Sequence, residues 1–443
     1  MPTRIFLFVS FLSVHAIAQT GKLRGSAPTR QQLAWHEMEY YLFAHFGPNT
    51  FTDKEWGEGT EPEDVFNPTN LDCRQWCRIA KSAGAKGIII TAKHHDGFCL
   101  WPSKYSTHTV RESKWKNGKG DVLKELSQAC KEYGLKFGVY ISPWDRNHPA
   151  YGSPEYNDVF VNMMKEIFAN YGPIWELWWD GANGEGPNGK KQVYDWDRFK
   201  KTIRALSPTT VIFSDVGPDI RWCGNEKGIA GETNWNYLDT AGFTPGAGAP
   251  PVDTLNQGNV RGKVWIPAEC DVSIRPGWFY HPEEDDKVKT PEQLFQIYLK
   301  SVGRGANLLL NVPPDRRGKI SEKDSAALVG FRRLRNQSFN SVFIESNSDS
   351  IVINFDKPIK TNCIVLRESL NDGQKVARFR VHFIETGNNS GEIKGTTIGH
   401  KRIITFPARV VRRLYLVLDS YRGNVAPKVS VSEYLIRENL VER

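Results

Sequence analysis

The chain has 443 residues and a formal net charge of +8, a length that exceeds one ordinary domain and fits a barrel-sized domain followed by a smaller one. Hydrophobic residues make up 40% and charged residues 24% of the chain, which excludes a largely disordered or low-complexity protein. Because the lysines and arginines are scattered and form only short runs, we expect no nucleic-acid partner despite the positive charge.

The first 18 residues have the pattern of a cleavable secretory signal. Arg4 precedes an apolar run from Ile5 to Val14, and the small-residue triplet Ala16-Ile17-Ala18 follows. The run is too short to span a bilayer, and no later segment approaches that length. No cysteine near Ala18 offers a lipid anchor. We therefore expect an exported protein, periplasmic or extracellular, with no membrane partner.

Short apolar runs then alternate with helical patterns, which is typical of repeated βα units. The expected strands are Glu39–Phe46, Gly87–Ala92, Lys136–Ser142, Trp175–Asp180, Val211–Asp215, Lys263–Ala268 and Asn307–Val312, with a weaker one around Ile229–Trp235. The expected helices are Cys73–Ser82, Val122–Glu132, Tyr156–Tyr171, Asp195–Leu206 and Pro291–Val302. These units predict a (β/α)₈ barrel over residues 19–342. The alternative, a doubly wound sheet, usually has a glycine-rich turn after its first strand, and the residues after Phe46 do not form one.

Residues 343–443 have a different pattern of apolar and polar residues. Segments such as SIVINFD, ARFRVHFIE and RRLYLVLDS alternate apolar and polar residues, which predicts an antiparallel β-sandwich. Because no exposed aromatic cluster stands out in this part of the sequence, we expect it to support the barrel rather than to bind carbohydrate.

Functional side chains of a barrel lie at the carboxyl ends of its strands. The polar and aromatic residues found there are His45, His94, His95, Tyr140, Trp144, Asp145, Asp180, Asp215, Glu226, Glu232, Glu269, Arg275 and Asn311. Asp145 and Asp215 also fit the role of helix N-caps. Adjacent histidines on a strand point to opposite sides and rarely bind one ion, and the chain has no HxH or HxxxH pair, so we expect no metal site.

Asp180 is the strongest catalytic candidate. It follows Trp178-Trp179 in the segment ELWWDGANGEG, and a carboxylate in such an apolar wall is unfavourable unless it is hydrogen-bonded or used in chemistry. Alternation places Trp178 on the side of Asp180 and Trp179 in the core. A carboxylate, a second carboxyl group across a cleft and aromatic walls are what glycoside hydrolysis requires.

Several segments resemble the α-L-fucosidases of glycoside hydrolase family 29. They are AHFGPNTF (44–51), EWG (55–57), AKHHDGFCLWPSKYS (92–106), LKFGVYISPWDRN (135–147), ELWWDGA (176–182) and LLLNVPPDRRG (308–318). The likeness runs from about Trp35 to Phe331. It implies a barrel followed by a β-sandwich, and a retaining double displacement without a metal or an organic cofactor.

The resemblance also implies roles for individual residues. Asp180 matches the family nucleophile. Candidate fucose-binding residues are His45, Glu55, Trp56, His94, His95, Tyr140, Trp144, Asp145 and Trp178, with Arg275 or Trp278 closing the pocket. The segments PWDRN and RWCGNEKG resemble the subgroup that prefers α-1,3/1,4-linked fucose on branched oligosaccharides, in which the glutamate of GNE, here Glu226, is the acid/base. Glu232 is the alternative, and Glu269 becomes a candidate if the chain belongs to the broader-specificity subgroup.

Three other functions remain open at this point. The chain could be an α-L-fucosidase that also accepts α-1,2 linkages, a catalytically silent fucose-binding barrel, or a hydrolase of another sugar such as α-galactose. The pairing of Asp180 with Glu226 argues against the silent barrel.

Overall fold

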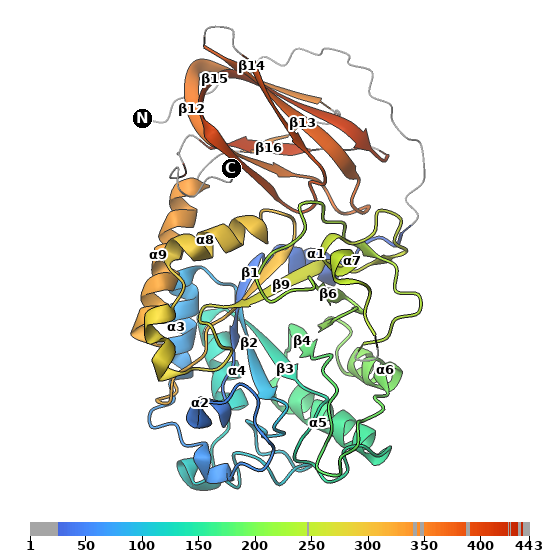
Figure 1. Ribbon diagram of the computed structural model, residues 1–443, viewed down its shortest axis with the longest axis vertical. Helices are drawn as coiled ribbons and strands as arrows, with labels where there is room; N and C mark the ends of the chain where they lie inside the picture. Colours follow the sequence, from blue (N-terminus) through green and yellow to red (C-terminus); the bar gives the residue numbers. More distant parts are fainter. Residues whose placement is uncertain are drawn as a thin grey trace.

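The computed structural model describes residues 25–245, 248–339, 343–345, 350–386, 390–423, 425, 427–432 and 436. It contains a closed barrel followed by an antiparallel sheet (Figure 1), which confirms the predicted fold class. The signal predicted at residues 1–18 and the domain boundary predicted at residue 342 lie outside the described residues. Within the described ranges, no helix is long and apolar enough to cross a membrane.

Eight parallel strands form the barrel. In order around it they are β1 (Tyr40–Ala44), β10 (Asn307–Asn311), β9 (Ala268–Ser273), β6 (Ile220–Trp222), β5 (Val211–Ser214), β4 (Glu176–Trp179), β3 (Lys136–Ile141) and β2 (Gly87–Lys93). Almost every residue of these strands is buried. Burial on both faces explains why the strands other than β6 and β9 appear in the sequence as largely apolar runs.

Two strand predictions are wrong. Ile229–Trp235 forms no strand, and the sixth barrel strand is β6, which has only three residues. In Lys263–Ala268, β8 (Val264–Trp265) pairs with β7 (Tyr237–Leu238) outside the barrel, and the barrel strand β9 begins only at the last residue of the range, Ala268. Strand β6 has no apolar pattern in the sequence because Arg221 occupies its middle position. The buried guanidinium of Arg221 donates hydrogen bonds to the carbonyl oxygens of Leu255 and Trp235.

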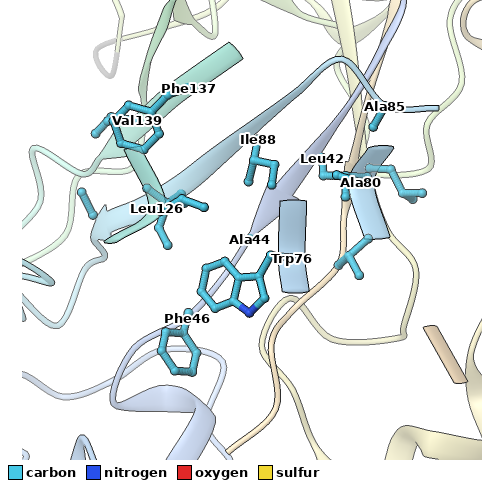
Figure 2. Close-up of a cluster of buried hydrophobic side chains, with 14 of the residues drawn as sticks. Leu42, Ala44, Phe46, Trp76, Ala80, Ala85, Ile88, Leu126, Phe137 and Val139 are labelled. Atoms are coloured by element: carbon cyan, nitrogen blue, oxygen red, sulfur yellow. The ribbon is translucent and has the colours of Figure 1, made fainter. Parts of the chain in front are cut away.

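Helices cover the outside of the barrel (Figure 1). They are α1 (Arg30–His36), α2 (Asn49–Thr52), α3 (Cys73–Ala83), α4 (Val122–Tyr133), α5 (Glu155–Tyr171), α6 (Trp196–Leu206), α7 (Val252–Gln257), α8 (Pro291–Lys300) and α9 (Glu322–Ser338), with 3₁₀ turns at Glu63–Val65, Trp115–Gly118 and Pro282–Lys287. Helices α3 and α4 begin at aspartate N-caps and end at left-handed glycines. Figure 2 shows Trp76 of α3 and Leu126 of α4 packed near Ile88 of β2 in the core between helices and barrel.

The C-terminal unit is one antiparallel sheet of six strands. Their order is β11 (Phe343–Glu345), β16 (Lys428–Val431), β12 (Ser350–Arg367), β15 (Arg402–Tyr421), β13 (Val376–Glu385) and β14 (Ser390–Gly395). A single apolar core draws on β12, β13, β15 and β16. Figure 1 shows this sheet at the end of the barrel near α1, away from the end where α2 and α5 lie.

Candidate active site

A cavity of about 230 Å³ lies at the carboxyl ends of the barrel strands. Ten residues singled out in the sequence line it: His45, Glu55, Trp56, His94, His95, Tyr140, Trp178, Asp180, Glu226 and Trp278. Phe43, Ala182 and Asp271 complete the wall. One small cavity therefore brings together imidazoles, indoles and carboxyl groups from most of the strands.

Asp180 stands directly after β4 and has a side chain that is 25% exposed. Its Oδ2 accepts a hydrogen bond from the Tyr140 hydroxyl at 2.9 Å, and its Oδ1 accepts one from the backbone N–H of Ala182 at 2.8 Å. The Nε2 of His95 lies 3.8 Å from Oδ2. The carboxylate is thus held in one orientation while it remains open to the cavity.

The side chains of the two tryptophans before Asp180 lie on opposite faces of β4, as strand alternation predicts. Trp178 lines the cavity, and its ring stacks on that of Phe213 with the centroids 4.1 Å apart. Trp179 is buried and packs against Trp196 and Phe199 on the outside of the barrel.

The three histidines of the cavity are neutral at neutral pH. Burial lowers the pKa of His45 to about 3 and that of His95 to about 4, and it also lowers the pKa of His94 well below the usual range. The Nδ1 of His45 lies 2.8 Å from the Asn311 side-chain oxygen, and that of His95 lies 2.8 Å from the Ser142 hydroxyl. Each ring therefore has one nitrogen that donates and one that accepts, as sugar hydroxyl groups require.

Glu55 fixes the segment that covers one side of the cavity. Its Oε2 accepts from the backbone N–H of Trp278 at 2.7 Å. Its Oε1 accepts from the N–H of Phe279 at 3.1 Å and lies 2.7 Å from Nε2 of His281. Asn311 adds a hydrogen bond to the Trp278 carbonyl oxygen at 2.7 Å. Glu55 therefore sets the position of Trp278 as well as lining the cavity itself.

Glu226 lies in the loop that follows β6. Its side chain is exposed, and its Oε2 accepts a hydrogen bond from the indole N–H of Trp278 at 3.3 Å. Of the three glutamates considered as acid/base, Glu226 alone lines the cavity with Asp180.

The two other glutamates lie elsewhere. The Glu232 side chain is 74% exposed and lies 3.8 Å from Arg402 of the C-terminal sheet. Glu269 is fully buried and accepts from the Trp178 indole N–H at 2.9 Å. Because β9 begins at Ala268, Glu269 is the second residue of the strand and lies inside the barrel rather than beyond its end.

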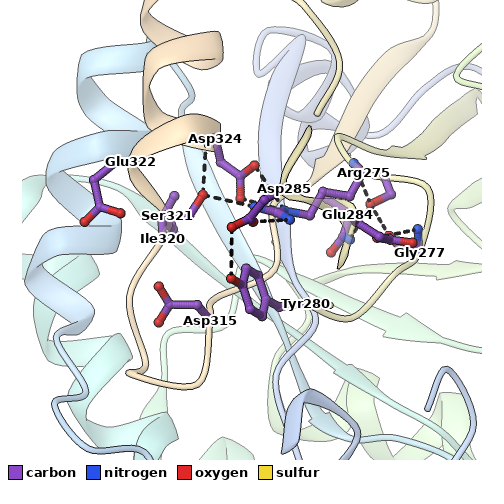
Figure 3. Close-up of polar contacts among 12 residues, drawn as sticks. Arg275, Gly277, Tyr280, Glu284, Asp285, Asp315, Ile320, Ser321, Glu322 and Asp324 are labelled. Carbon is purple, nitrogen blue, oxygen red and sulfur yellow. Dashed lines mark hydrogen bonds and ion pairs between the residues drawn. The ribbon is translucent and has the colours of Figure 1, made fainter. Parts of the chain in front are cut away.

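Arg275 does not line the cavity. It is fully buried, its Nε donates to both carboxylate oxygens of Asp324, and its Nη1 lies 2.9 Å from Asp285 (Figure 3). These ion pairs anchor the start of the segment that leads to Trp278. Of the two residues proposed to close the pocket, only Trp278 reaches it.

Trp144 and Asp145 stand behind the cavity wall rather than in it. The Trp144 ring packs against those of Trp56 and His95, with centroids 5.6 and 4.8 Å away. Asp145 is buried 3.3 Å from Nζ of Lys93 and accepts hydrogen bonds from the backbone N–H groups of the second and third residues after it. Asp145 is therefore neither a substrate contact nor a helix N-cap: it closes a local turn, and the next helix, α5, has Pro154 at its N-cap.

Comparisons with known proteins identify the family of the chain. A family model described as alpha-L-fucosidase matches residues 10–331. Alpha-L-fucosidase 1 of Arabidopsis thaliana is 40% identical over 467 residues, covering 95% of this chain and 91% of the plant protein. A glycoside hydrolase 29 family member from an unknown rumen bacterium has a similar structure, with 42% identity, a TM-score of 0.87 and coverage of 94% of this chain and 78% of that one. A Ruminococcus gnavus family 29 fucosidase, solved in complex with fucose, is 27% identical with a TM-score of 0.84, covering 96% and 98% of the two chains.

The chain belongs to the alpha-L-fucosidases of glycoside hydrolase family 29. It is a glycoside hydrolase that acts on O-glycosyl bonds of fucosylated glycans. Within the part of the chain that the structure describes, no group of three or more His, Cys, Asp or Glu side chains is placed to hold a metal ion.

The fucosidase cavity has one carboxyl group that the sequence interpretation missed. Asp271 of β9 is 5% exposed, lines the cavity and accepts a hydrogen bond from the Trp222 indole N–H at 2.8 Å. Burial raises the pKa of Asp271 well above the usual range. The signal was present, because Glu269, Asp271 and Ser273 alternate in AECDVS, but the strand was expected to end at Ala268. Phe43 and Ala182 were missed because neither has a polar group.

Proposed function

We propose that Asp180 is the nucleophile and Glu226 the acid/base of a retaining double displacement. The observation that supports this most strongly is that both carboxyl groups line one cavity at the ends of the barrel strands. Asp180 is held by Tyr140 and the backbone, as an attacking group requires, while Glu226 lies exposed at the side where a leaving group departs. A retaining enzyme needs the two carboxyl groups about 5–5.5 Å apart.

In the first step, an Asp180 oxygen attacks the anomeric carbon and the glycosidic C–O bond breaks. Protonated Glu226 gives its proton to the departing oxygen, and a β-linked fucosyl-enzyme forms. In the second step, ionised Glu226 removes a proton from water, the water oxygen attacks the anomeric carbon, and Asp180 leaves. Two inversions give net retention.

The neutral histidines and the aromatic wall account for fucose recognition in this proposal. His45, His94 and His95 exchange hydrogen bonds with sugar hydroxyl groups. Phe43 and Trp178, whose ring centroids lie 5.5 Å apart, form the apolar surface for the C6 methyl group. Filling that space disfavours galactose, whose extra hydroxyl finds no partner there, although such a pocket discriminates by only about 100-fold.

Azide tests the two roles by product stereochemistry. In Glu226→Ala, azide should intercept the β-linked intermediate and give α-fucosyl azide. In Asp180→Ala, azide should replace the nucleophile directly and give β-fucosyl azide. The opposite pairing of products would mean that the two roles are exchanged.

We further propose a preference for α-1,3/1,4-linked fucose on branched oligosaccharides. The subgroup with this preference carries its acid/base in the GNE segment, and here that glutamate, Glu226, lines the cavity, whereas Glu269 is enclosed in the barrel. Trp56, 57% exposed at the cavity, offers a face for a second sugar ring. A Lewis-type trisaccharide should be cleaved at least about 100-fold faster than 2′-fucosyllactose. Equal rates would point to a broad-specificity enzyme.

Export is proposed from the N-terminal pattern of residues 1–18. Expression of the full chain in a Gram-negative host should yield a periplasmic protein whose N-terminus is Gln19. A cytoplasmic product that begins at Met1 would contradict the proposal.

A further inference from the structure

The loop that carries Glu226 links the catalytic cavity to the C-terminal sheet. It leaves β6 after Trp222, and Glu226 lines the cavity. Six residues later, the carbonyl oxygen of Glu232 accepts hydrogen bonds from the side chains of Thr396 and Arg402 in the C-terminal unit. A short segment therefore runs from the cavity to the second domain.

The part of this loop nearest the cavity is closed by two asparagines. The Nδ2 of Asn225 donates to the Ile229 carbonyl oxygen at 2.8 Å. The Nδ2 of Asn256 donates to that same oxygen at 2.8 Å and to the Cys223 carbonyl oxygen at 3.1 Å. These bonds set the shape of the loop around Glu226 but leave its far end to other contacts.

Two buried side chains of the C-terminal unit hold that far end. Gln374, between β12 and β13, donates to the Asn234 carbonyl oxygen at 2.9 Å and accepts from the Asn236 N–H at 2.8 Å. Thr397, between β14 and β15, accepts from the Asn234 N–H at 2.9 Å. Gln374 is 0% and Thr397 2% exposed. Barrel-domain groups hold the same segment as well: the Trp235 N–H donates to the Gln257 carbonyl oxygen at 2.7 Å, and the Asn234 side chain donates to the Arg304 carbonyl oxygen at 3.0 Å. Loss of Gln374 or Thr397 still leaves a buried backbone group of Asn234 or Asn236 without its partner, which favours a shift of the segment.

We propose that the C-terminal domain positions the acid/base, with Gln374 and Thr397 as positioning residues that act through residues 226–236 on Glu226. The inference rests on the proposed role of Glu226. The nucleophile has no comparable dependence, because Asp180 is held by Tyr140 and Ala182 inside the barrel domain. The C-terminal domain therefore supports one half of the reaction selectively.

This selectivity gives a kinetic signature that a merely structural contact lacks. Methyl α-L-fucoside has a poor leaving group, methoxide, which needs a proton from the acid. The leaving group of 4-nitrophenyl α-L-fucoside, 4-nitrophenolate, departs with little assistance. Displacement of Glu226 should lower kcat/KM for the methyl fucoside far more than for the 4-nitrophenyl fucoside, because small errors in the position of a reacting group are costly.

The test compares kcat/KM on these two fucosides in Thr397→Val and Gln374→Leu. Thr397→Val keeps the shape of the side chain and replaces the hydroxyl group that accepts from the Asn234 N–H by a methyl group. In both variants, the ratio of methyl to 4-nitrophenyl activity should fall about tenfold, and in Thr397→Ser it should return to within about twofold of wild type. Unchanged ratios in the folded valine and leucine variants would overturn the inference.

Lys401→Met is the matched control from the same domain interface. Lys401 donates to Glu39, just before β1, and to the Tyr298 hydroxyl of α8, both outside the Glu226 loop. This variant should lower the melting temperature without changing the ratio. A drop in the ratio equal to that of Thr397→Val would mean a general effect of the interface and would also overturn the inference.

Glu226→Ala, measured alongside, separates the two proposals. A collapsed ratio in Glu226→Ala with a normal ratio in Thr397→Val contradicts the positioning role alone. A normal ratio in Glu226→Ala contradicts the acid/base assignment, and the positioning role falls with it.

Discussion

The two carboxyl groups assigned to catalysis are held in opposite ways. Asp180 follows a buried barrel strand and receives two hydrogen bonds from its own domain. Glu226 stands on an exposed loop, receives one indole hydrogen bond at 3.3 Å, and is followed by a segment that the other domain anchors. A nucleophile must keep one fixed line of attack, while an acid/base must reach first the leaving oxygen and then water. The difference between a strand end and a loop matches these two tasks.

The largest effect is expected at the strand end. Asp180→Asn keeps the shape of the side chain but removes the nucleophile, so kcat on 4-nitrophenyl α-L-fucoside should fall at least about 10⁴-fold. The folded state should be preserved, which a circular dichroism spectrum can check. Activity within tenfold of wild type would remove Asp180 from this role.

The assignment of the acid/base to the loop after β6 is tested by substitutions at two glutamates six positions apart. Glu226→Gln should lower kcat/KM on an oligosaccharide by about 10²–10⁴-fold, because general acid assistance is lost. Glu232→Gln should stay within about twofold of wild type, since its side chain is exposed at the C-terminal sheet. Steady-state kinetics on a Lewis-type trisaccharide measures both, and the reverse order would make Glu232 the acid/base.

A smaller effect is expected where Tyr140 orients the nucleophile. Tyr140→Phe removes only the hydroxyl that donates to Asp180. We expect kcat to fall about 10- to 100-fold on good and poor leaving groups alike, because a hydrogen bond to a charged group contributes about 1.5–3 kcal/mol. A fall in kcat that is confined to substrates with poor leaving groups would mean that Tyr140 assists the general acid instead of the nucleophile.

The smallest expected effect is on the pH dependence of the free energy of unfolding, through Glu176 inside the barrel. Burial and the neighbouring Glu269 raise the pKa of Glu176 well above its usual value. The folded state then keeps a proton that the unfolded chain releases above the ordinary glutamate pKa. The free energy of unfolding should therefore decrease as pH rises, by up to about 1.4 kcal/mol per pH unit.

Glu176→Gln retains an acceptor for the Trp35 indole and carries no charge. Urea unfolding between about pH 5 and 8 should show a shallower dependence on pH in this variant than in the wild type. Equal slopes would mean that Glu176 releases its proton as readily in the folded state as in the unfolded chain.

The same contrast between strand and loop explains what the sequence could predict. Asp180, His45 and Tyr140 lie in or just after long apolar runs, so strand alternation and barrel geometry were enough to bring them to one end. Strand β6 was hidden because Arg221 interrupts it, and its buried charge is satisfied by carbonyl oxygens from distant loops. With β6 missed, spacing alone could not separate Glu226 from Glu232.

Other misplacements came from long-range partners that no local pattern encodes. Arg275 was expected near the sugar, but Asp324 of α9 holds it in the protein interior. Asp145 was grouped with the site, but Lys93 and a local turn satisfy its charge. The anchoring of residues 234–236 by Gln374 and Thr397 likewise joins positions more than a hundred residues apart.

The central claim is that Asp180 forms the covalent intermediate, and trapping tests it most directly. Incubation with 2-deoxy-2-fluoro-α-L-fucosyl fluoride should label the enzyme once, and peptide mass spectrometry should locate the sugar on Asp180 in the ELWWDGA segment. A label on Glu226, Asp271 or any other carboxyl group would contradict the account.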